Sequence, residues 1–240
     1  AIPPAQVRKY FQINHMVAFL GPALRALRAR HAHVRLLDIG CGRSYLSLLI
    51  AWCAREVWCH PHTIVGVDRK ASLVDESKRR AEAAGLADAM QFVVGDAAEL
   101  AIPDVHGVVA LHACDTATCD ALAFGIERGV DVIAVAPCCQ AELARGWSQL
   151  AAAGRTGPFA SVWTAPHLRR ETGADITDAM RVQLLRAAGY EAEAMEFVPA
   201  EHTRKNTLIR AIRTGAPDAS ALAAYHELRD ATGGVGITLA

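Results

Sequence analysis

Apolar residues along this sequence follow two patterns that alternate between residues 34 and 152. Short, almost continuously apolar runs, typical of strands buried in a parallel sheet, are separated by segments whose apolar residues recur every three or four positions, as on one face of a helix. This alternation predicts βαβ units with right-handed crossovers, and therefore a parallel sheet. The predicted strands are 34–38, 63–68, 90–94, 107–112 and 130–136, and the predicted helices are 44–54, 70–84, 116–128 and 141–152.

The segments on either side of this alternation complete the predicted domain. An N-terminal helix, within residues 1–30, is expected to pack on the sheet near the ligand because it precedes the first strand. This helix is predicted over residues 6–30. The further elements are an irregular glycine- and proline-bearing stretch at 154–171, a helix at 177–188, strands at 191–198 and 207–213, and a helix at 219–231 within a C-terminal tail, 215–240. The short connection between the last two strands allows only an antiparallel pair. We expect one α/β domain over residues 1–240, with a mostly parallel seven-stranded sheet, an antiparallel last strand and helices on both faces.

Composition narrows the class of protein. The 240 residues are 52% hydrophobic, which excludes a disordered chain, and 25 Lys+Arg balance 25 Asp+Glu to a net charge of zero. A non-specific nucleic-acid binder is usually basic overall, so binding of RNA would require a local basic patch. No apolar stretch is long enough to span a membrane, and the first residues lack the pattern of a signal peptide. Seven cysteines without a Cys-x-x-Cys motif favour a reducing cytoplasm over a disulfide framework or a zinc ribbon.

The most informative segment, residues 36–49, joins the first predicted strand to the first predicted helix. The strand ends in Asp38, a Gly-Cys-Gly turn follows at 40–42, and the helix starts near Ser44. Glycines at such a turn let the backbone approach a ligand closely, because no Cβ intervenes. Tyr45 stands where a dinucleotide fingerprint needs its third glycine, and no Gly-Lys-Ser/Thr of a P-loop follows. The motif that remains is Asp-x-Gly-x-Gly.

Two further acids end the next two predicted strands. Asp68 follows the second strand and Asp96 follows the third, in register with Asp38. A carboxylate at the second strand tip can accept hydrogen bonds from both hydroxyls of a ribose. Three carboxylates at successive strand tips suit a cationic ligand without phosphates, such as S-adenosylmethionine (SAM), which carries a sulfonium, an ammonium and a ribose diol. The alternative is that these acids are helix N-caps in an α/β domain of another function.

The pattern resembles that of class I SAM-dependent methyltransferases, which implies a Rossmann-like fold, SAM as cofactor and S-adenosylhomocysteine (SAH) as its product. In that family the three acidic positions bind the methionyl end, the ribose and the adenine. The segment RKYFQINH at 8–15 resembles an element of rRNA dimethyladenosine methyltransferases that touches the methionine end of SAM. The cofactor-binding residues that these resemblances imply are Gln12, Asn14, His15, Asp38, Gly40, Gly42, Tyr45, Asp68, Arg69, Asp96, Ala97, Leu111 and His112.

Four motifs resemble a narrower subgroup of methyltransferase-domain proteins over residues 8–213. They are RKYFQINHM, DIGCGRSYL, LHACDTAT with PCCQ, and HTRKNTLIR. The subgroup includes bacterial members of unassigned substrate and a eukaryotic tRNA acceptor-stem 2′-O-methyltransferase. That tRNA enzyme carries short Cys/His zinc modules outside its methyltransferase domain, and this sequence contains nothing like them.

The tips of the fourth and fifth predicted strands are neighbours in this fold and carry the candidate catalytic residues, His112, Cys114, Asp115, Cys138 and Cys139. Three mechanisms are open. Cys138 or Cys139 can be a nucleophile activated by His112, or His112 and the thiols can bind zinc. In the third mechanism, the methyl group passes directly to an oxygen or nitrogen acceptor, with His112 or Asp115 as base or orienter. We favour the third, in which the cysteines only pack and no metal is bound.

Substrate contacts are expected from two basic clusters after the fifth strand. Their residues are His167, Arg169 and Arg170 in the first, and His202, Arg204, Lys205 and Asn206 in the second. If both clusters flank the cleft they can contact phosphates, and otherwise they are solvated surface. Trp163 can stack on a base or belong to the core. Residues 58–62 (WCHPH) are predicted to be a loop rather than a metal site.

These patterns predict a cytoplasmic SAM-dependent methyltransferase that acts on an oxygen or nitrogen atom of RNA, either tRNA or rRNA, without membrane association. Two alternatives stay open. One is methylation of a small molecule or a protein, and the other is a SAM-binding module without turnover.

Overall fold

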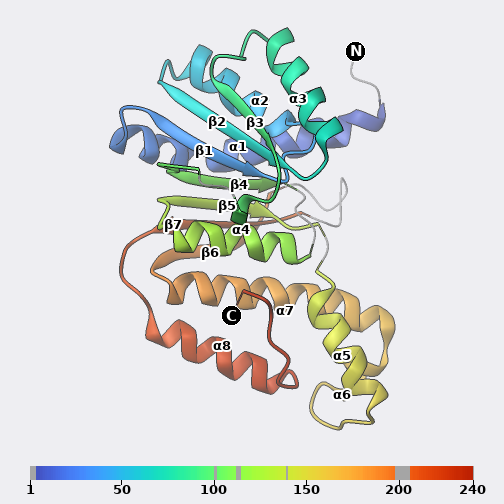
Figure 1. Cartoon of the computed structure of the whole chain (residues 1–240). Helices are drawn as coiled ribbons and strands as arrows, with labels where there is room; N and C mark the ends of the chain where they lie inside the picture. Colours follow the sequence, from blue (N-terminus) through green and yellow to red (C-terminus); the bar gives the residue numbers. More distant parts are fainter. Residues whose placement is uncertain (1–3, 100–101, 112–114, 139, 198–205, 240) are drawn as a thin grey trace.

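The computed structural model describes residues 4–99, 102–111, 115–138, 140–197 and 206–239. Within them, seven strands form one sheet in the order β3-β2-β1-β4-β5-β7-β6 (Figure 1). The strands are β1 (Val34–Ile39), β2 (His62–Asp68), β3 (Met90–Val94), β4 (Gly107–Leu111), β5 (Val132–Ala136), β6 (Tyr190–Glu196) and β7 (Thr207–Arg213). Neighbouring strands from β3 to β5 are parallel, whereas β7 is antiparallel to both β5 and β6. The predicted α/β fold with its mostly parallel seven-stranded sheet is confirmed.

The central strands are buried because helices cover both faces of the sheet. Adjacent residues of β1 show the two faces, since Leu36 belongs to an apolar cluster with α1 and α2, and Leu37 belongs to another with α4 and α7. Burial on both sides explains why β1, β4 and β5 are almost continuously apolar. The helices are α1 (Pro4–Arg30), α2 (Tyr45–Trp52), α3 (Ala71–Ala83), α4 (Thr116–Glu127), α5 (Glu142–Ala152), α6 (Ala160–Thr164), α7 (Pro166–Ala187) and α8 (Ala219–Ala231), with a π-helical turn η1 (Cys53–Val57) after α2 and a 3₁₀ turn η2 (Ala97–Glu99) after β3.

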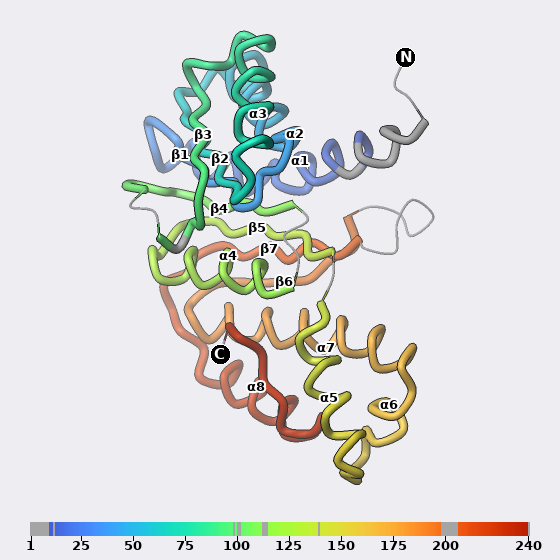
Figure 2. Tube along the Cα trace, turned by 45° about the vertical axis from the view of Figure 1, so that its right-hand side comes forward, coloured from blue at the N-terminus to red at the C-terminus, as the bar shows by residue number. Residues whose placement is uncertain are grey.

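The direction of strand order reverses between β1 and β4. From β1 the chain adds β2 and β3 on one side, then returns to add β4 and β5 on the other. In such open sheets, ligands bind beyond the carboxyl ends of the strands at this reversal. Helix α1 lies along one face of the sheet (Figure 2).

The helix predicted at 177–188 lies within α7, but the prediction that residues 154–171 are irregular throughout is wrong. Helix α6 forms inside that stretch, and α7 begins at Pro166. Proline is well suited to the first turn of a helix because its missing N–H has no intrahelical partner there, and Ala165 before it is extended. Gly173 is part of α7, where a Cβ would lie 3.4 Å from the Cβ of Ala144 in α5. This glycine brings two helices close together rather than ending one.

Helices α5, α6 and α8 form an outer layer that packs mainly on α7 (Figure 2). Two small apolar clusters hold this layer, one around Trp147 and Trp163 and the other around Met180 and Tyr225. The C-terminal segment then returns to α5, where the backbone N–H of Thr238 donates to Glu142 Oε1 at 2.8 Å. Among the described helices, none combines the length and apolar character needed to cross a membrane.

Candidate functional site

The glycine turn between β1 and α2 is fixed by its backbone geometry and by bonds to β2. Gly40 and Gly42 have φ of 70° and 55°, in the left-handed region that glycine adopts without steric penalty. The N–H groups of Gly40 and Cys41 both donate to Val67 O, at 2.9 and 3.0 Å. The turn is therefore anchored to β2, and neither glycine has a side chain that would keep a ligand away.

Asp38, the first predicted acid, lies in β1 next to this turn. It is 2% exposed, and Ser47 of α2 donates a hydrogen bond to its carboxylate. Burial raises the pKa of Asp38 to about 7; the hydrogen bond from Ser47 opposes this shift, and the charge of Asp68 adds to it. A neighbouring cation would stabilise the ionised form of such a carboxyl, so the site favours a positively charged ligand.

Asp68, the second predicted acid, connects the glycine turn to the start of α3. Its Oδ2 accepts from the Gly42 N–H at 2.9 Å, and its Oδ1 accepts from the Lys70 N–H at 2.9 Å. An ionised carboxylate offers about four acceptor positions. Asp68 therefore retains capacity for two ligand hydroxyls while its backbone bonds hold it in place.

Asp96, the third predicted acid, lies near a further carboxyl, that of Asp120, which does not stand at a strand tip. Asp96, which follows β3, forms an ion pair with the exposed Arg69, which follows β2. Asp120 of α4 lines the same hollow, and burial together with the charge of Asp96 raises the pKa of Asp120. Asp120 was missed because it lies inside a helix rather than at a strand tip. Its spacing of three residues from Ala117, which also lines the hollow, is the signal that could have revealed it.

These residues line two hollows that share Gly40. The first, of about 210 Å³, is lined by Ile13, Asp38, Gly40, Cys41, Gly42, Arg43, Tyr45, Leu46 and Leu111. The second, of about 360 Å³, is lined by Ile39, Gly40, Val67, Asp68, Arg69, Lys70, Gly95, Asp96, Ala97, Ala117 and Asp120. Nine of the thirteen predicted cofactor-binding residues therefore line one hollow or the other: Asp38, Gly40, Gly42, Tyr45 and Leu111 in the first, and Gly40 again with Asp68, Arg69, Asp96 and Ala97 in the second.

Helix α1 contributes Ile13 to the first hollow rather than its polar neighbours. Asn14 Nδ2 donates to Tyr10 O at 2.8 Å, within the helix. His15 Nδ1 lies 2.9 Å from Phe197 O, just after β6. Both predicted cofactor ligands thus have partners away from the hollow, and the side chain of Gln12 lies outside the described residues.

Asp115, a predicted catalytic residue, links the tip of β4 to the start of α5. Its Oδ1 accepts from the N–H groups of Ala141 and Glu142, at 2.9 and 3.1 Å, and its Oδ2 lies 2.7 Å from Arg145 Nη1. Burial acts to raise the pKa of Asp115, but the hydrogen bonds from Ala141 and Arg145 outweigh it and hold this pKa below its ordinary value. A carboxylate with these partners is a weak base, so its contacts favour the orienting role.

The other predicted catalytic residues are only partly described. Cys138 is half-buried after β5, and His112, Cys114 and Cys139 lie outside the described residues. Across the part of the chain that the structure describes, no three His, Cys, Asp or Glu side chains are grouped so as to hold a metal ion.

Comparison with known proteins identifies the family to which the chain belongs. A family model described as a methyltransferase domain matches residues 8–146, which is more than half of the chain. The chain belongs to this methyltransferase family. The matched segment contains both hollows and the tips of the first five strands.

The fold of the methyltransferase is similar to that of enzymes solved with SAM or SAH. Magnesium protoporphyrin IX methyltransferase (ChlM) from Synechocystis PCC 6803 with bound SAH is 16% identical, with a TM-score of 0.53 over 89% of each chain. Its SAM-bound form matches with the same TM-score of 0.53 over 88% of this chain and 82% of that chain. This likeness concerns the fold alone, which is that of class I SAM-dependent methyltransferases.

Among curated proteins, the uncharacterized protein YjhP of Escherichia coli (strain K12) is 35% identical over 95 residues, or 40% of this chain. The methyltransferase spans only about a third of the length of that relative, 32%.

SAM is the cofactor of the methyltransferase, and the residues of the two hollows fit it. The carboxyl groups of Asp38, Asp68, Asp96 and Asp120 provide negative charge for a cation and acceptors for hydroxyl and amino groups. The glycine turn leaves room for close approach of the ligand. The first hollow, beside α1 and β4, suits the methionyl end, and the second, beyond β2 and β3, suits the nucleoside.

The predicted substrate residues of the methyltransferase fall into two groups. His167 and Arg170 are exposed on the first turns of α7. Arg169 donates to Trp163 O, in the last turn of α6, at 2.6 Å. This end of α7 lies on the same side of the molecule as the carboxyl ends of the parallel strands (Figure 1). In the second group, Asn206 Nδ2 donates to Glu196 Oε1 at 2.9 Å across the β6–β7 hairpin. His202, Arg204 and Lys205 lie outside the described residues.

Trp163 and residues 58–62 have roles in packing and chain connection rather than in binding. Trp163 is 3% exposed inside the outer apolar cluster, so it is a core residue. Residues 58–61 connect η1 to β2 as predicted, whereas His62 is the first residue of β2. His60 Nε2 in this loop lies 2.9 Å from His31 O.

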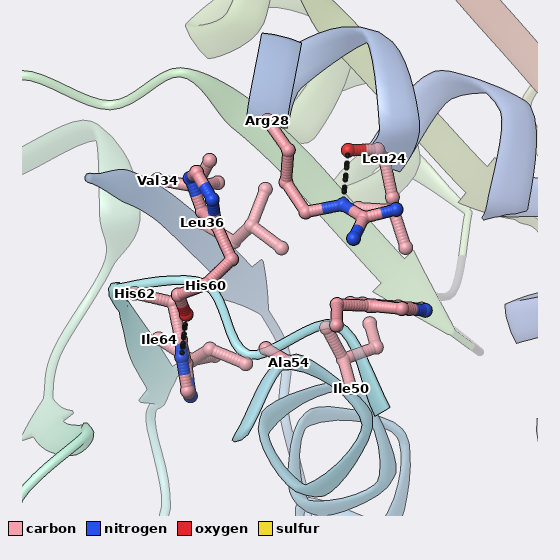
Figure 3. Close-up of a pocket in the computed structure, with 10 residues that line it drawn as sticks. Leu24, Arg28, Val34, Leu36, Ile50, Ala54, His60, His62 and Ile64 are labelled. Atoms are coloured by element: carbon pink, nitrogen blue, oxygen red, sulfur yellow. Dashed lines mark hydrogen bonds between the residues drawn. The ribbon is translucent and has the colours of Figure 1, made fainter. Parts of the chain in front are cut away.

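A third, small apolar hollow of the methyltransferase lies between α1 and η1, at the amino ends of β1 and β2 (Figure 3). Arg28 covers it and stacks over the Trp58 ring, 4.8 Å from the ring centroid. Ligands of this fold bind at the opposite ends of the strands, so this hollow is a gap in packing.

Proposed function

We propose that this methyltransferase transfers the methyl group of SAM to an oxygen or nitrogen atom of RNA, at the tips of β4 and β5. We also propose that it belongs to the subgroup whose motifs include LHACDTAT and PCCQ. The methyltransferase activity follows from the family and the cofactor site, and the acceptor is the new element of the proposal.

The exposed aromatic pair on α1 is the observation that carries the choice of RNA. Tyr10 is 49% exposed and Phe11 is 36% exposed, and their ring centroids lie 5.9 Å apart at an interplanar angle of 73°. They lie on α1 within one helical turn of Ile13, which lines the first hollow. Unpaired nucleobases stack on exposed aromatic rings of this kind.

The described residues suggest how the transfer proceeds. When bound, SAM supplies a methyl group made electrophilic by its sulfonium. Asp38 and Asp68 would hold the positively charged and ribose parts of the cofactor, while Asp115 connects the tip of β4 to the start of α5. We assign removal of the acceptor proton to His112, since the partners of Asp115 lower its pKa.

Labelling with tritiated SAM tests the acceptor class. Purified protein is incubated with the RNA, protein and small-molecule fractions of a strain that lacks it, and we expect label in RNA alone. Label confined to protein or metabolites would contradict the RNA proposal and support the alternative acceptors. SAM binding without label in any fraction would favour a binding module.

The aromatic pair has a matched control on the same helix. Phe19 is also 36% exposed, but its backbone carbonyl accepts from Arg210 of β7, farther along α1 from the first hollow. Because stacking contributes about 1–3 kcal/mol per base, Tyr10→Ala with Phe11→Ala should raise the KM for RNA about 10-fold or more. Phe19→Ala should leave it unchanged, and the KM for SAM should stay constant in both. Equal effects of the two changes would contradict a base-stacking role.

Covalent catalysis by a thiol is the competing mechanism. Cys138→Ser and Cys139→Ser should each retain activity if the methyl group passes directly to the acceptor. Loss of transfer in either variant with unchanged SAH binding would instead support a cysteine nucleophile.

A further inference from the structure

A buried ion pair on α7 lies outside both cofactor hollows. Arg181 is fully buried and Asp178 is 6% exposed, and Arg181 Nη1 lies 2.9 Å from Asp178 Oδ1. Burying two charges costs desolvation free energy, and apolar residues of similar volume often stabilise a protein as well or better. This pair therefore points to a role other than stability.

Arg181 holds the tip of β4. Its Nη2 donates to Asp115 O at 2.9 Å and lies 3.3 Å from Cys119 Sγ in α4. Asp115 follows directly on residues 112–114 and has φ 54° and ψ −117°, a backbone conformation that non-glycine residues rarely adopt. The hydrogen bond to its carbonyl restrains a strained residue next to the proposed transfer site.

Asp178 holds the tip of β5. Its Oδ2 accepts from Gln140 Nε2 at 2.7 Å, and Gln140 is 7% exposed. Gln140 comes directly after Cys138 and Cys139, so its side chain fixes the end of the segment that carries the two candidate thiols.

Asp115 closes these contacts into a ring. Its carboxylate accepts from the Ala141 N–H at 2.9 Å, and Ala141 directly follows Gln140. The tips of β4 and β5 are thus joined to each other and to one helix through Asp115, Arg181, Asp178 and Gln140. Movement of one tip relative to the other would break at least one of these bonds.

We propose that Arg181 and Asp178 are positioning residues for methyl transfer, which fix the separation of the β4 and β5 tips and hence the place of the acceptor beside the methyl group. The inference rests on the proposed function in one respect, the assignment of the acceptor side to these tips. A misplacement of about 1 Å at a reacting centre can reduce the rate about 100-fold.

The volume-conserving pair Asp178→Leu with Arg181→Met tests this role without leaving a single buried charge. We expect kcat for the labelled acceptor fraction to fall about 10- to 100-fold. The KM for SAM, the Kd for SAH and the melting temperature should stay close to those of the wild type. Arg181→Lys keeps the charge, but one ammonium group cannot reach both Asp178 and the Asp115 carbonyl. This variant should show the same loss of kcat.

Arg186→Met is the matched control on the same helix. Arg186 donates to Ala192 O of β6 at 3.0 Å, away from the strand tips. This variant should retain kcat. The proposal is overturned if the double variant keeps wild-type kcat, or if its kcat, SAH affinity and melting temperature all fall together.

A second readout does not require an acceptor. The rate of alkylation of Cys138 by iodoacetamide, followed by peptide mass spectrometry, should rise several-fold in the double variant because the β5 tip is released. Arg186→Met should alkylate at the wild-type rate. An unchanged rate in the double variant would overturn the positioning role, and this result is independent of whether RNA proves to be the acceptor.

Discussion

Asp38 in the first hollow and Asp115 beyond β4 have pKa values shifted in opposite directions, because their surroundings differ. Asp38 is buried with one hydroxyl partner, and its pKa is raised to about 7. Asp115 accepts from two N–H groups and from Arg145, and its pKa is lowered. We therefore expect the charge of Asp38 to change when a cationic ligand binds, whereas Asp115 stays ionised and structural.

The raised pKa of Asp38 predicts a proton release on binding of SAM. The ordinary value of 3.8 is raised to about 7 by burial, so Asp38 stabilises the ligand-free fold at pH values below 3.8, and this contribution is lost as the pH rises through 7. Cationic SAM favours the ionised carboxylate, so its affinity should rise between about pH 5 and 7. Calorimetry at pH 6.5 in buffers of different ionisation enthalpy should detect the released proton. Asp38→Asn should abolish the release, and equal release from both proteins would contradict this role.

Gly66 of β2 packs closely against Phe92 and against Cys41 of the glycine turn. A Cβ there would lie 2.8 Å from Phe92 Cδ1 and 3.0 Å from Cys41 Sγ. Gly66→Ala should therefore cost about 1–3 kcal/mol of unfolding free energy, measured by urea denaturation, and should weaken SAH binding by displacing Cys41. The control is Gly21→Ala in α1, where the Cβ would be 3.5 Å from Arg25 Nη1 and helix propensity should give a gain of about 0.5–1 kcal/mol. Equal stability changes in the two variants would contradict the steric account.

At the scale of elements, α7 connects the carboxyl ends of the parallel strands to the outer layer. Its first turns carry His167 and Arg170, its middle carries the buried pair, and its end leads into β6. Helices α5, α6 and α8 pack against it, so their positions follow from its placement. Because the predicted helix starts at residue 177 and α7 starts at Pro166, the sequence placed His167 and Arg170 in an irregular stretch rather than on a helix.

The C-terminal segment is expected to stabilise α5 through a close contact with Gly146. A Cβ at Gly146 would lie 2.5 Å from Val235 Cγ1. Gly146→Ala should displace the segment and lower the unfolding free energy by about 1–3 kcal/mol. Val235→Ala should recover part of that loss in the double variant, which a double-mutant cycle measures as a coupling of about 0.5 kcal/mol or more. Additive effects would show that the segment does not press on α5.

At the scale of the whole molecule, the sequence alone predicts those site residues that stand at the ends of parallel strands. The acids Asp38, Asp68 and Asp96 were predicted as a group because the carboxyl ends of parallel strands meet at one edge of the sheet. Asp120 and Arg181 were not, since each belongs to a helix whose facing residues depend on packing across the sheet. The start of α7 was missed because Pro166 and Gly173, read as breaks, serve as a helix start and a helix contact.

The central claim is that the glycine turn and the strand-tip acids bind the cofactor. Calorimetric titration with SAH tests it most directly, in the wild type, in Asp68→Ala and in the control Asp75→Ala, which removes an exposed acid of α3. We expect one SAH per chain in the wild type and in Asp75→Ala. Loss of hydrogen bonds from a charged group, worth about 1.5–3 kcal/mol, should weaken SAH binding about 10- to 100-fold in Asp68→Ala. No binding to the wild type, or unchanged affinity in Asp68→Ala, would contradict the account.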